Sequence, residues 1–311
     1  MPRAAGFIRK NRIALCAQKL YDGAINSWED PMGKFDNKLL LSDYDNTLHF
    51  TEAALREGES LPPISPRNLE AIRYWMDQGG RFAVATGRAL AAFRRQAESV
   101  PMNAPSIVDN GAAIYDLARR EYLVRRFLPE SVLDHLAAVM AAFPGVSLEL
   151  YPEAGPVQVM RPSDWNDKHA QLTGLPFQEI TSPDRSQVVL PLAKALFIAQ
   201  RGELEGLYDF AAVRGWLEDY EMIFSSDHLL EMTAKGANKG DMALRLRDLC
   251  GCGELICIGD HANDLPMLRA ADRAFAPANA IGEVLESGAQ VVCHCLDGAL
   301  AEVVEAVEAA L

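Results

Sequence analysis

Residues 39–48 of this 311-residue chain read LLLSDYDNTL. The three leucines at its start predict a strand buried on both faces, which is typical of a parallel sheet flanked by helices. The strand ends in two carboxylates, Asp43 and Asp45, one residue apart. Ligands of open α/β sheets bind beyond the carboxyl ends of the strands. This stretch therefore predicts the fold class and the place of a functional site.

The alternation of helices and strands continues after this stretch and returns near the C-terminus. Such a βαβαβ order predicts an α/β fold with a doubly wound, Rossmann-like parallel sheet. The predicted helices of this part are 66–78, 89–99, 239–249, 264–270, 281–287 and 298–310, and its strands after the first are 81–85, 106–108, 255–258, 274–276 and 291–293.

The rhythm changes between these two parts. A hairpin is predicted over 115–127, and a proline-rich loop follows a helix over 164–172. We therefore predict an N-terminal appendage (1–36), a core domain in two segments (37–115 and 227–311) and an inserted α+β cap domain (116–226). The other predicted elements of the insert are helices at 130–143 and 204–213 and strands at 146–150, 157–160, 195–199 and 221–224.

Charge and hydropathy limit the partners of the chain. The formal net charge is −13 and the pI about 5.0, which argues against nucleic acid or an anionic membrane surface as a main partner. The sequence contains no stretch long and apolar enough to span a bilayer. We expect a cytoplasmic protein with no membrane partner. The sequence does not indicate the oligomeric state. A small anionic substrate is compatible with the net charge, since local groups and a metal ion can hold it.

Three more polar motifs stand at predicted strand ends or helix starts. Thr86-Gly87-Arg88 follows the second strand, Lys239-Gly240 opens a helix, and GDHAND (259–264) follows a later strand. Strand ends of a doubly wound sheet meet at one crevice. The expected site therefore contains carboxylates, a hydroxyl, an ammonium and backbone N–H groups.

This inventory suits phosphoryl transfer. The acids bind a hard cation such as Mg²⁺, which prefers oxygen ligands. The ammonium and oriented N–H groups offset negative charge on the phosphoryl oxygens. A carboxylate nucleophile can form an aspartyl-phosphate, and a second acid can transfer the proton.

The four motifs, in this order, resemble those of the haloacid dehalogenase (HAD) superfamily of phosphatases. Within it the chain is similar to the Cof-type branch, which carries a large α/β cap between the second and third motifs. The resemblance covers residues 38–311. It implies that Asp43 is the nucleophile and a ligand of Mg²⁺, that Asp45 is the general acid and base and binds the metal through its backbone carbonyl, and that Asp260 is a further metal ligand.

The resemblance also implies roles for the remaining motif residues. Asn46 stands where the family usually has glycine, and asparagine tolerates unusual backbone angles better than most residues. ATP-driven pumps of the superfamily have threonine two positions after the nucleophile, so Asp45 favours a phosphatase or a mutase. The expected phosphate-binding residues are Thr86, Gly87, Lys239 and Asn46, and the expected supporting residues are Asn263, Asp264 and Asn110.

Substrate choice is expected to depend on the insert, which would close over the crevice. We predict a Mg²⁺-dependent phosphatase of small phosphorylated metabolites such as sugar phosphates. The alternatives are a sugar phosphomutase and a non-catalytic protein that binds a phosphometabolite and regulates others. The candidate substrate contacts are Arg88, Glu149, Gln158 and Arg161, with Tyr151 and Met160 beside them.

Overall fold

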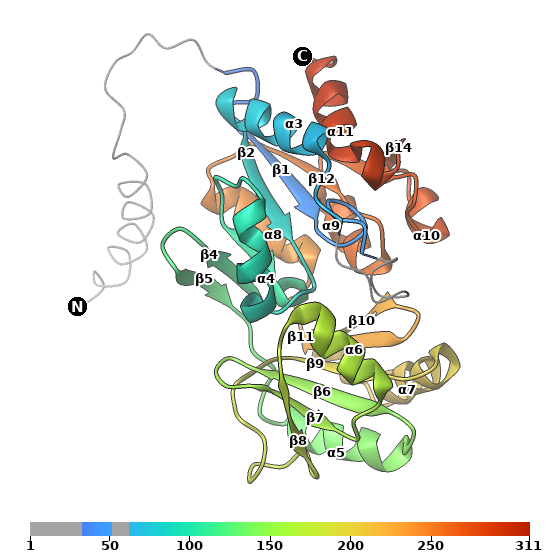
Figure 1. Cartoon of the computed structure of the whole chain (residues 1–311). Coiled ribbons are helices and arrows are strands. Elements are labelled where there is room, and N and C mark those ends of the chain that lie inside the picture. The colour runs from blue at the N-terminus through green and yellow to red at the C-terminus, as the bar shows by residue number, and fades with distance from the viewer. Residues whose placement is uncertain (1–32, 52–61) are drawn as a thin grey trace, which may run out of the picture. The chain divides into compact units, whose positions relative to one another are not determined.

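An eight-stranded sheet contains the stretch at residues 39–48 (Figure 1). The computed structural model describes residues 33–51 and 62–311. The strands run in the order β14-β13-β12-β1-β2-β3-β4-β5, parallel from β14 to β3 and antiparallel at β4 and β5. The predicted doubly wound parallel sheet is confirmed. Its strands are β1 (Lys38–Asp43), β2 (Arg81–Ala85), β3 (Ser106–Val108), β4 (Ala113–Asp116), β5 (Glu121–Arg125), β12 (Glu254–Ile258), β13 (Arg273–Pro277) and β14 (Gln290–Val292).

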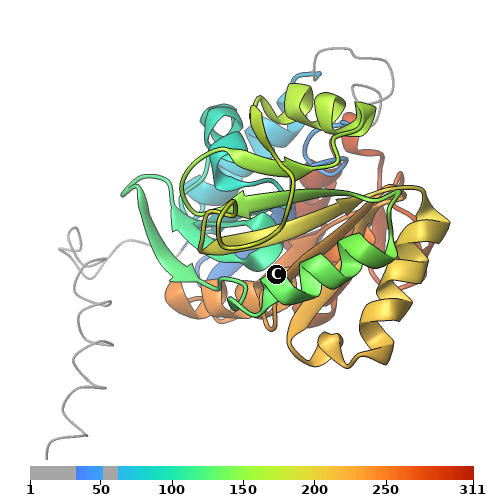
Figure 2. The same ribbon diagram turned by 90° about the horizontal axis from the view of Figure 1, so that it is seen from below.

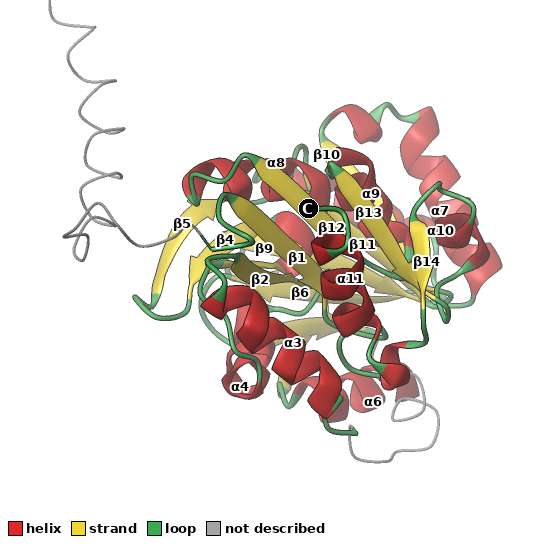
Figure 3. Cartoon of the chain, turned by 90° about the horizontal axis from the view of Figure 1, so that it is seen from above, coloured by secondary structure: helices red, strands yellow, loops and turns green. Residues whose placement is uncertain are grey.

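Helices cover both faces of this sheet (Figure 3). Leu40 packs in the cluster under the first helix layer, and Leu39 and Leu41 pack in the cluster under the second. Side chains alternate between the faces of a strand, so a strand between two helix layers is apolar throughout. The first layer is α3 (Pro66–Asp77), α4 (Leu90–Gln96) and α11 (Ala299–Glu308), and the second is α8 (Lys239–Leu249), α9 (Leu265–Ala270) and α10 (Gly282–Leu285).

A six-stranded sheet forms the insert, in the order β10-β11-β9-β6-β7-β8. Its strands are antiparallel except for the pair β7 and β8. The helices α5 (Val132–Ala142) and α7 (Arg201–Val213) bury their apolar sides against it (Figure 2). The other elements are β6 (Ser147–Pro152), β7 (Val157–Met160), α6 (Asp164–Thr173), β8 (Phe177–Ile180), β9 (Leu192–Ile198), β10 (Tyr220–Ser226) and β11 (Leu229–Ala234).

The membership of two strands favours other boundaries for the insert than those predicted. β5 joins the eight-stranded sheet although the insert was predicted to begin at residue 116, and β11 joins the six-stranded sheet although the core was predicted to resume at 227. β8 lies within the stretch predicted as a loop. Hairpin sequences do not specify which sheet they extend, because strand preference depends on the neighbouring strands. We propose that the insert comprises residues 126–235.

The N-terminal boundary also changes. Residues 1–32 of the predicted appendage lie outside the described residues. Phe35 is fully buried, and its ring stacks on that of Trp75 with centroids 4.2 Å apart. The apolar core therefore includes part of the segment predicted to precede it.

Gly240, the second residue of α8, permits a close approach to α9. A Cβ atom at this position would lie 2.4 Å from the backbone oxygen of Pro266. We expect Gly240→Ala to lower the free energy of unfolding by about 1–3 kcal/mol, because the two helices would have to separate. Urea denaturation measures the change.

Gly202 supplies the matched control, since it is the second residue of α7 and, outside its own helix backbone, no atom of the described residues lies within 4 Å of its Cβ position. Gly202→Ala should leave stability unchanged or raise it by up to about 1 kcal/mol. Equal stability of the Gly240→Ala variant and the wild type would contradict the close approach.

Candidate active site

Strand register brings three of the polar motifs together. Asp43, the last residue of β1, pairs in register with Ala85 of β2, so Thr86 follows directly beside it. On the other side of β1, Ser42 pairs with Ile258 of β12, and Asp260 follows two residues later. The residues of the predicted site therefore meet at the carboxyl ends of β1, β2 and β12.

Lys239 connects two of the acids. Its Nζ lies 2.5 Å from Oδ1 of Asp43 and 2.6 Å from Oδ1 of Asp264. The helix α8 begins at this lysine, and the N-cap Asn238 accepts a hydrogen bond from the backbone N–H of Asp241 at 2.8 Å. Burial alone would lower the pKa of Lys239, but the charges of Asp264 and Asp43 raise it above its ordinary value. Lys239 is therefore a buried ammonium at the centre of the site.

The loop after β12 is held by the second carboxylate oxygen of Asp264. This Oδ2 accepts hydrogen bonds from the backbone N–H groups of Asp260 and His261, both at 3.0 Å. From the first motif, Thr47 donates its hydroxyl to Oδ1 of Asp260 at 3.0 Å. The role of Thr47 was not predicted, although its place in the first motif put it near the site.

Three acids form a cluster that suits a divalent cation. One oxygen from each of Asp43, Asp260 and Asp264 lies within 4.8 Å of the other two, and all three residues are buried. Burial and the Asp264 charge raise the pKa of Asp43 to about 7, and burial and the Asp43 charge raise that of Asp260 well above its usual value. Three carboxylates and one ammonium have an excess of two negative charges when ionised. Oxygen ligands with this charge fit Mg²⁺.

Asp45 lies in a different environment. Arg88 forms a two-pronged ion pair with it, with Nη2 to Oδ1 at 2.6 Å and Nε to Oδ2 at 2.9 Å. Burial would raise the pKa of Asp45, but the charge and the hydrogen bonds of Arg88 outweigh it and lower the pKa. The pKa values of the two acids of the first motif are thus shifted in opposite directions, upward for Asp43 and downward for Asp45.

The second motif forms a tight loop beside Asn110. The hydroxyl of Thr86 accepts the backbone N–H of Arg88 at 3.0 Å. Gly87 lies so close to Asn110 that a Cβ there would be 3.1 Å from its amide oxygen. That oxygen accepts a hydrogen bond from Asn263 at 3.0 Å. The structure therefore brings these predicted phosphate-binding and supporting residues into one place.

Asn46 has a φ of +55°, in the left-handed region that its replacement of glycine suggested. Its side-chain oxygen accepts the backbone N–H of Thr51 at 3.0 Å, and its backbone oxygen accepts the amide of Asn279 at 2.7 Å. These contacts support the turn after Asp45. A phosphate contact by Asn46 stays a prediction.

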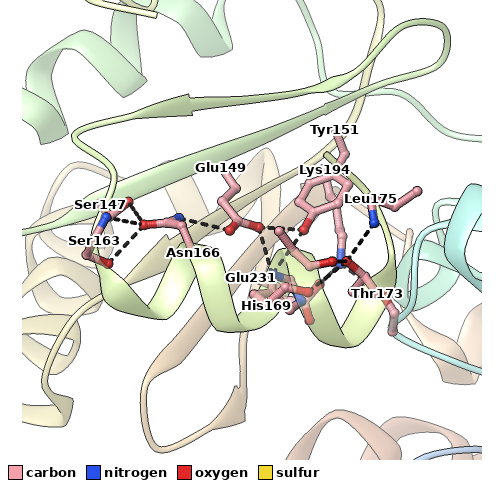
Figure 4. Close-up of polar contacts among 12 residues, drawn as sticks. Ser147, Glu149, Tyr151, Ser163, Asn166, His169, Thr173, Leu175, Lys194 and Glu231 are labelled. Carbon is pink, nitrogen blue, oxygen red and sulfur yellow. Dashed lines mark hydrogen bonds and ion pairs between the residues drawn. The ribbon is translucent and has the colours of Figure 1, made fainter. Parts of the chain in front are cut away.

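The candidate substrate contacts in the insert have partners within the insert. Oε1 of Glu149 accepts Nδ2 of Asn166 at 2.9 Å, and Oε2 accepts the hydroxyl of Tyr151 at 2.5 Å (Figure 4). Gln158 hydrogen-bonds to the backbone of Gln187 and Val189.

Arg161 donates to the carbonyl oxygens of Met140 and Phe143 at the end of α5, which suits a structural role. Met160 packs at the edge of the apolar cluster of the insert. Substrate contact by these residues remains a prediction.

Sequence reasoning missed a lysine that joins the insert to the core. Nζ of Lys194 in β9 donates to the backbone oxygen of Gly87 at 2.8 Å and pairs with Oε2 of Glu231 at 2.7 Å. Both side chains are buried. The only sign in the sequence is a single charge within a mostly apolar stretch, LAKALFI.

Comparison with known proteins agrees with this geometry. The family model for haloacid dehalogenase-like hydrolases matches residues 40–304. The chain belongs to this family. The predicted resemblance is thereby confirmed, and the match spans both sheets.

Individual relatives are more distant or cover less. "Putative phosphatase YxeH" of Bacillus subtilis is 42% identical over 72 residues, which are 22% of this chain and 27% of that protein. The alignment thus spans about a quarter of that curated relative.

Among solved structures, BT1666 of Bacteroides thetaiotaomicron is described as one of the HAD phosphatases. It is 20% identical to this chain with a TM-score of 0.72, and the match covers 91% of this chain and 99% of the BT1666 chain. The sugar phosphatase BT4131 is 18% identical with a TM-score of 0.71, covering 86% and 98%. At these identities the likeness shows the shared fold.

Membrane association was not expected from the sequence. Among residues 33–51 and 62–311, no helix has the length and apolar character that a bilayer span requires.

Replacement of Lys239 tests the central ion pairs. Lys239→Met leaves Asp43 and Asp264 buried without their cation, and we expect it to lower the free energy of unfolding by about 3–5 kcal/mol. The measurement is urea denaturation at pH 7 in buffer free of divalent cations. The double variant Lys239→Met/Asp264→Asn should recover part of the loss, because it removes one unpaired carboxylate. A single variant as stable as the wild type would contradict the assignment.

Proposed function

We propose that the protein is a Mg²⁺-dependent phosphatase that hydrolyses small phosphomonoesters through an aspartyl-phosphate on Asp43. The observation that carries the proposal is the division between the two acids of the first motif. Asp43 lies against Lys239 and the acid cluster, and Asp45 lies against Arg88. One acid is thus held among groups that stabilise phosphoryl oxygens, and the other is held at the edge, where a leaving group would depart.

In the first step, a carboxylate oxygen of Asp43 forms a bond to phosphorus and the bond to the ester oxygen breaks. Asp45, when protonated, gives its proton to that oxygen, and this step requires the ion pair with Arg88 to loosen. In the second step, Asp45 takes a proton from water, which attacks phosphorus and releases phosphate from Asp43. The ion pair with Arg88 favours the ionised form of Asp45, which is the form that the second step needs.

The remaining residues hold the phosphoryl group and its charge. We propose that Thr86 and the backbone N–H of Gly87 donate to phosphoryl oxygens, and Lys239 supplies a positive charge next to Asp43. We propose that Asp43, Asp260 and the backbone carbonyl of Asp45 bind Mg²⁺, with Asp264 nearby. When bound, the cation would offset the charge of the acids and of the phosphoryl oxygens.

The proposed substrates are small phosphorylated metabolites, with sugar phosphates as the first class to test. Support comes from the fold shared with BT4131, whose description is sugar phosphatase. A complete set of acids supports turnover rather than binding alone, since a regulator that only binds has no need of both Asp43 and Asp45.

A para-nitrophenyl phosphate assay tests the proposal. We expect turnover with Mg²⁺ and its loss in EDTA, because without the cation the acid cluster opposes an incoming phosphate. Asp43→Asn should abolish turnover, since the amide is no nucleophile, and should leave thermal unfolding with Mg²⁺ near that of the wild type.

Phosphate release is measured in parallel, and it separates hydrolysis from transfer to a second hydroxyl. Full activity of the Asp43→Asn variant, or activity that EDTA does not change, would overturn the proposal.

A further inference from the structure

The six-stranded sheet has a second face, opposite α5 and α7, that carries buried charges. Ala195 and Phe197 of β9 belong to the apolar cluster under these helices, so Lys194 and Leu196 point to the opposite face. In β11, Leu230 and Met232 belong to that cluster, so Glu231 between them also points to the opposite face.

This charged face is turned toward the core. Ala89, which follows Arg88 in the second motif, packs against the cluster of Tyr151, Leu196 and Ile198 on it. The hydrogen bond from Lys194 to the backbone oxygen of Gly87 makes a second contact to the same loop. The face with the charges is thus the one that meets the Thr86–Arg88 loop.

Lys194 is held tightly at this place. Its side chain is 4% exposed, and that of Glu231 is 5% exposed. The ammonium lies 4.6 Å from the ring centroid of Tyr151. Gly87 and Glu231 account for two of its three N–H donors among the described residues.

The fold does not need these charges. Desolvation of a buried ion pair offsets most of its attraction, so apolar side chains of similar size would stabilise the sheet face as well. Leu196 and Ile198 already cover the neighbouring positions. A buried pair directed at the Thr86–Arg88 loop is better explained by a ligand.

The position of Gly87 specifies which part of a ligand the pair would meet. Thr86, the proposed phosphate-binding hydroxyl, precedes it, and Arg88 follows it and holds Asp45, the proposed proton donor to the leaving group. Lys194 therefore lies on the side of the leaving group.

Asp109 adds a second carboxylate beside this loop, since its Oδ2 accepts the backbone N–H of Leu90 at 3.4 Å. Burial raises its pKa to about 6, with the Lys194 charge acting in the opposite direction.

We propose that Lys194 and Glu231 determine specificity by hydrogen bonding to the hydroxyl groups of an uncharged sugar or polyol leaving group. This inference rests on the proposed phosphatase function. A hydroxyl both donates and accepts, so it satisfies the ammonium and the carboxylate together. A leaving group with a second anionic charge would meet two carboxylates, Glu231 and Asp109, and one ammonium. Sugar monophosphates are therefore favoured over sugar bisphosphates.

The test compares wild type and Lys194→Met on esters with different leaving groups. The substrates are the 6-phosphates of glucose, mannose and fructose, fructose 1,6-bisphosphate, and para-nitrophenyl phosphate, whose leaving group has no further hydroxyl. For the fastest hexose 6-phosphate, the variant should lose at least about tenfold in kcat/KM, which corresponds to about 1.4 kcal/mol. Its kcat/KM for para-nitrophenyl phosphate should change by less than about threefold, because the phosphoryl site is intact. Wild type should prefer that hexose monophosphate to the bisphosphate.

Two further variants control for folding and for charge. The single variant leaves Glu231 buried without its cation, which could unfold the protein. Lys194→Met/Glu231→Gln removes both buried charges and should therefore remain folded. It should show the same selective loss of kcat/KM on the hexose 6-phosphate. Lys235→Met removes an exposed lysine that donates to the backbone oxygen of Leu217, and it should behave as wild type.

Equal losses on the hexose phosphate and on para-nitrophenyl phosphate would overturn the inference, because they would assign Lys194 a general structural role. A Lys194→Met variant with the wild-type ratio of kcat/KM for the hexose 6-phosphate to that for para-nitrophenyl phosphate would overturn it as well. So would a wild type that hydrolyses para-nitrophenyl phosphate but no hexose phosphate. A wild type inactive on every ester would instead contradict the phosphatase function itself, and the inference with it.

Discussion

The ion pairs of Lys239 with Asp43 and Asp264 are the interaction on which the rest of the site depends. They connect the end of β1, the start of α8 and the loop after β12 through one buried ammonium. Gly240 lets α8 approach α9 closely enough for this contact. The second carboxylate oxygen of Asp264 then fixes the backbone of Asp260. Without a cation at this point, three buried carboxylates would repel one another.

The core and its site could be predicted from the sequence because their determinants are local. A strand buried on both faces is apolar along its whole length, as at Leu39–Leu41, and β1, β2 and β12 each end at a polar motif. Parallel topology then brings the motif residues together without any knowledge of their contacts. Thr86 and Asp260 follow this rule in the structure, and Lys239 joins them from the start of α8.

The insert could be predicted only in outline, because its determinants are contacts between distant residues. β5 lies in the predicted hairpin and β11 in a stretch for which no strand was predicted, and only their pairing assigns each to a sheet. Lys194 lies 107 positions from Gly87, and nothing near it in the sequence indicates that contact. Glu149 was expected at the substrate, and its three partners in the insert, Asn166, Tyr151 and His169, could not be read from the sequence. The residue type alone does not show whether a charged side chain is buried or exposed.

The central claim is that Asp43 carries the phosphoryl group during turnover. Mixing the enzyme with Mg²⁺ and para-nitrophenyl phosphate, quenching in acid within the first turnovers, and analysing the peptides by mass spectrometry tests it directly. The account predicts one phosphoryl group on the peptide that contains Asp43, assigned by fragmentation to Asp43 and absent in the Asp43→Asn variant. Steady release of phosphate with no phosphorylated peptide at any quench time, or a phosphoryl group on Asp45, would contradict it.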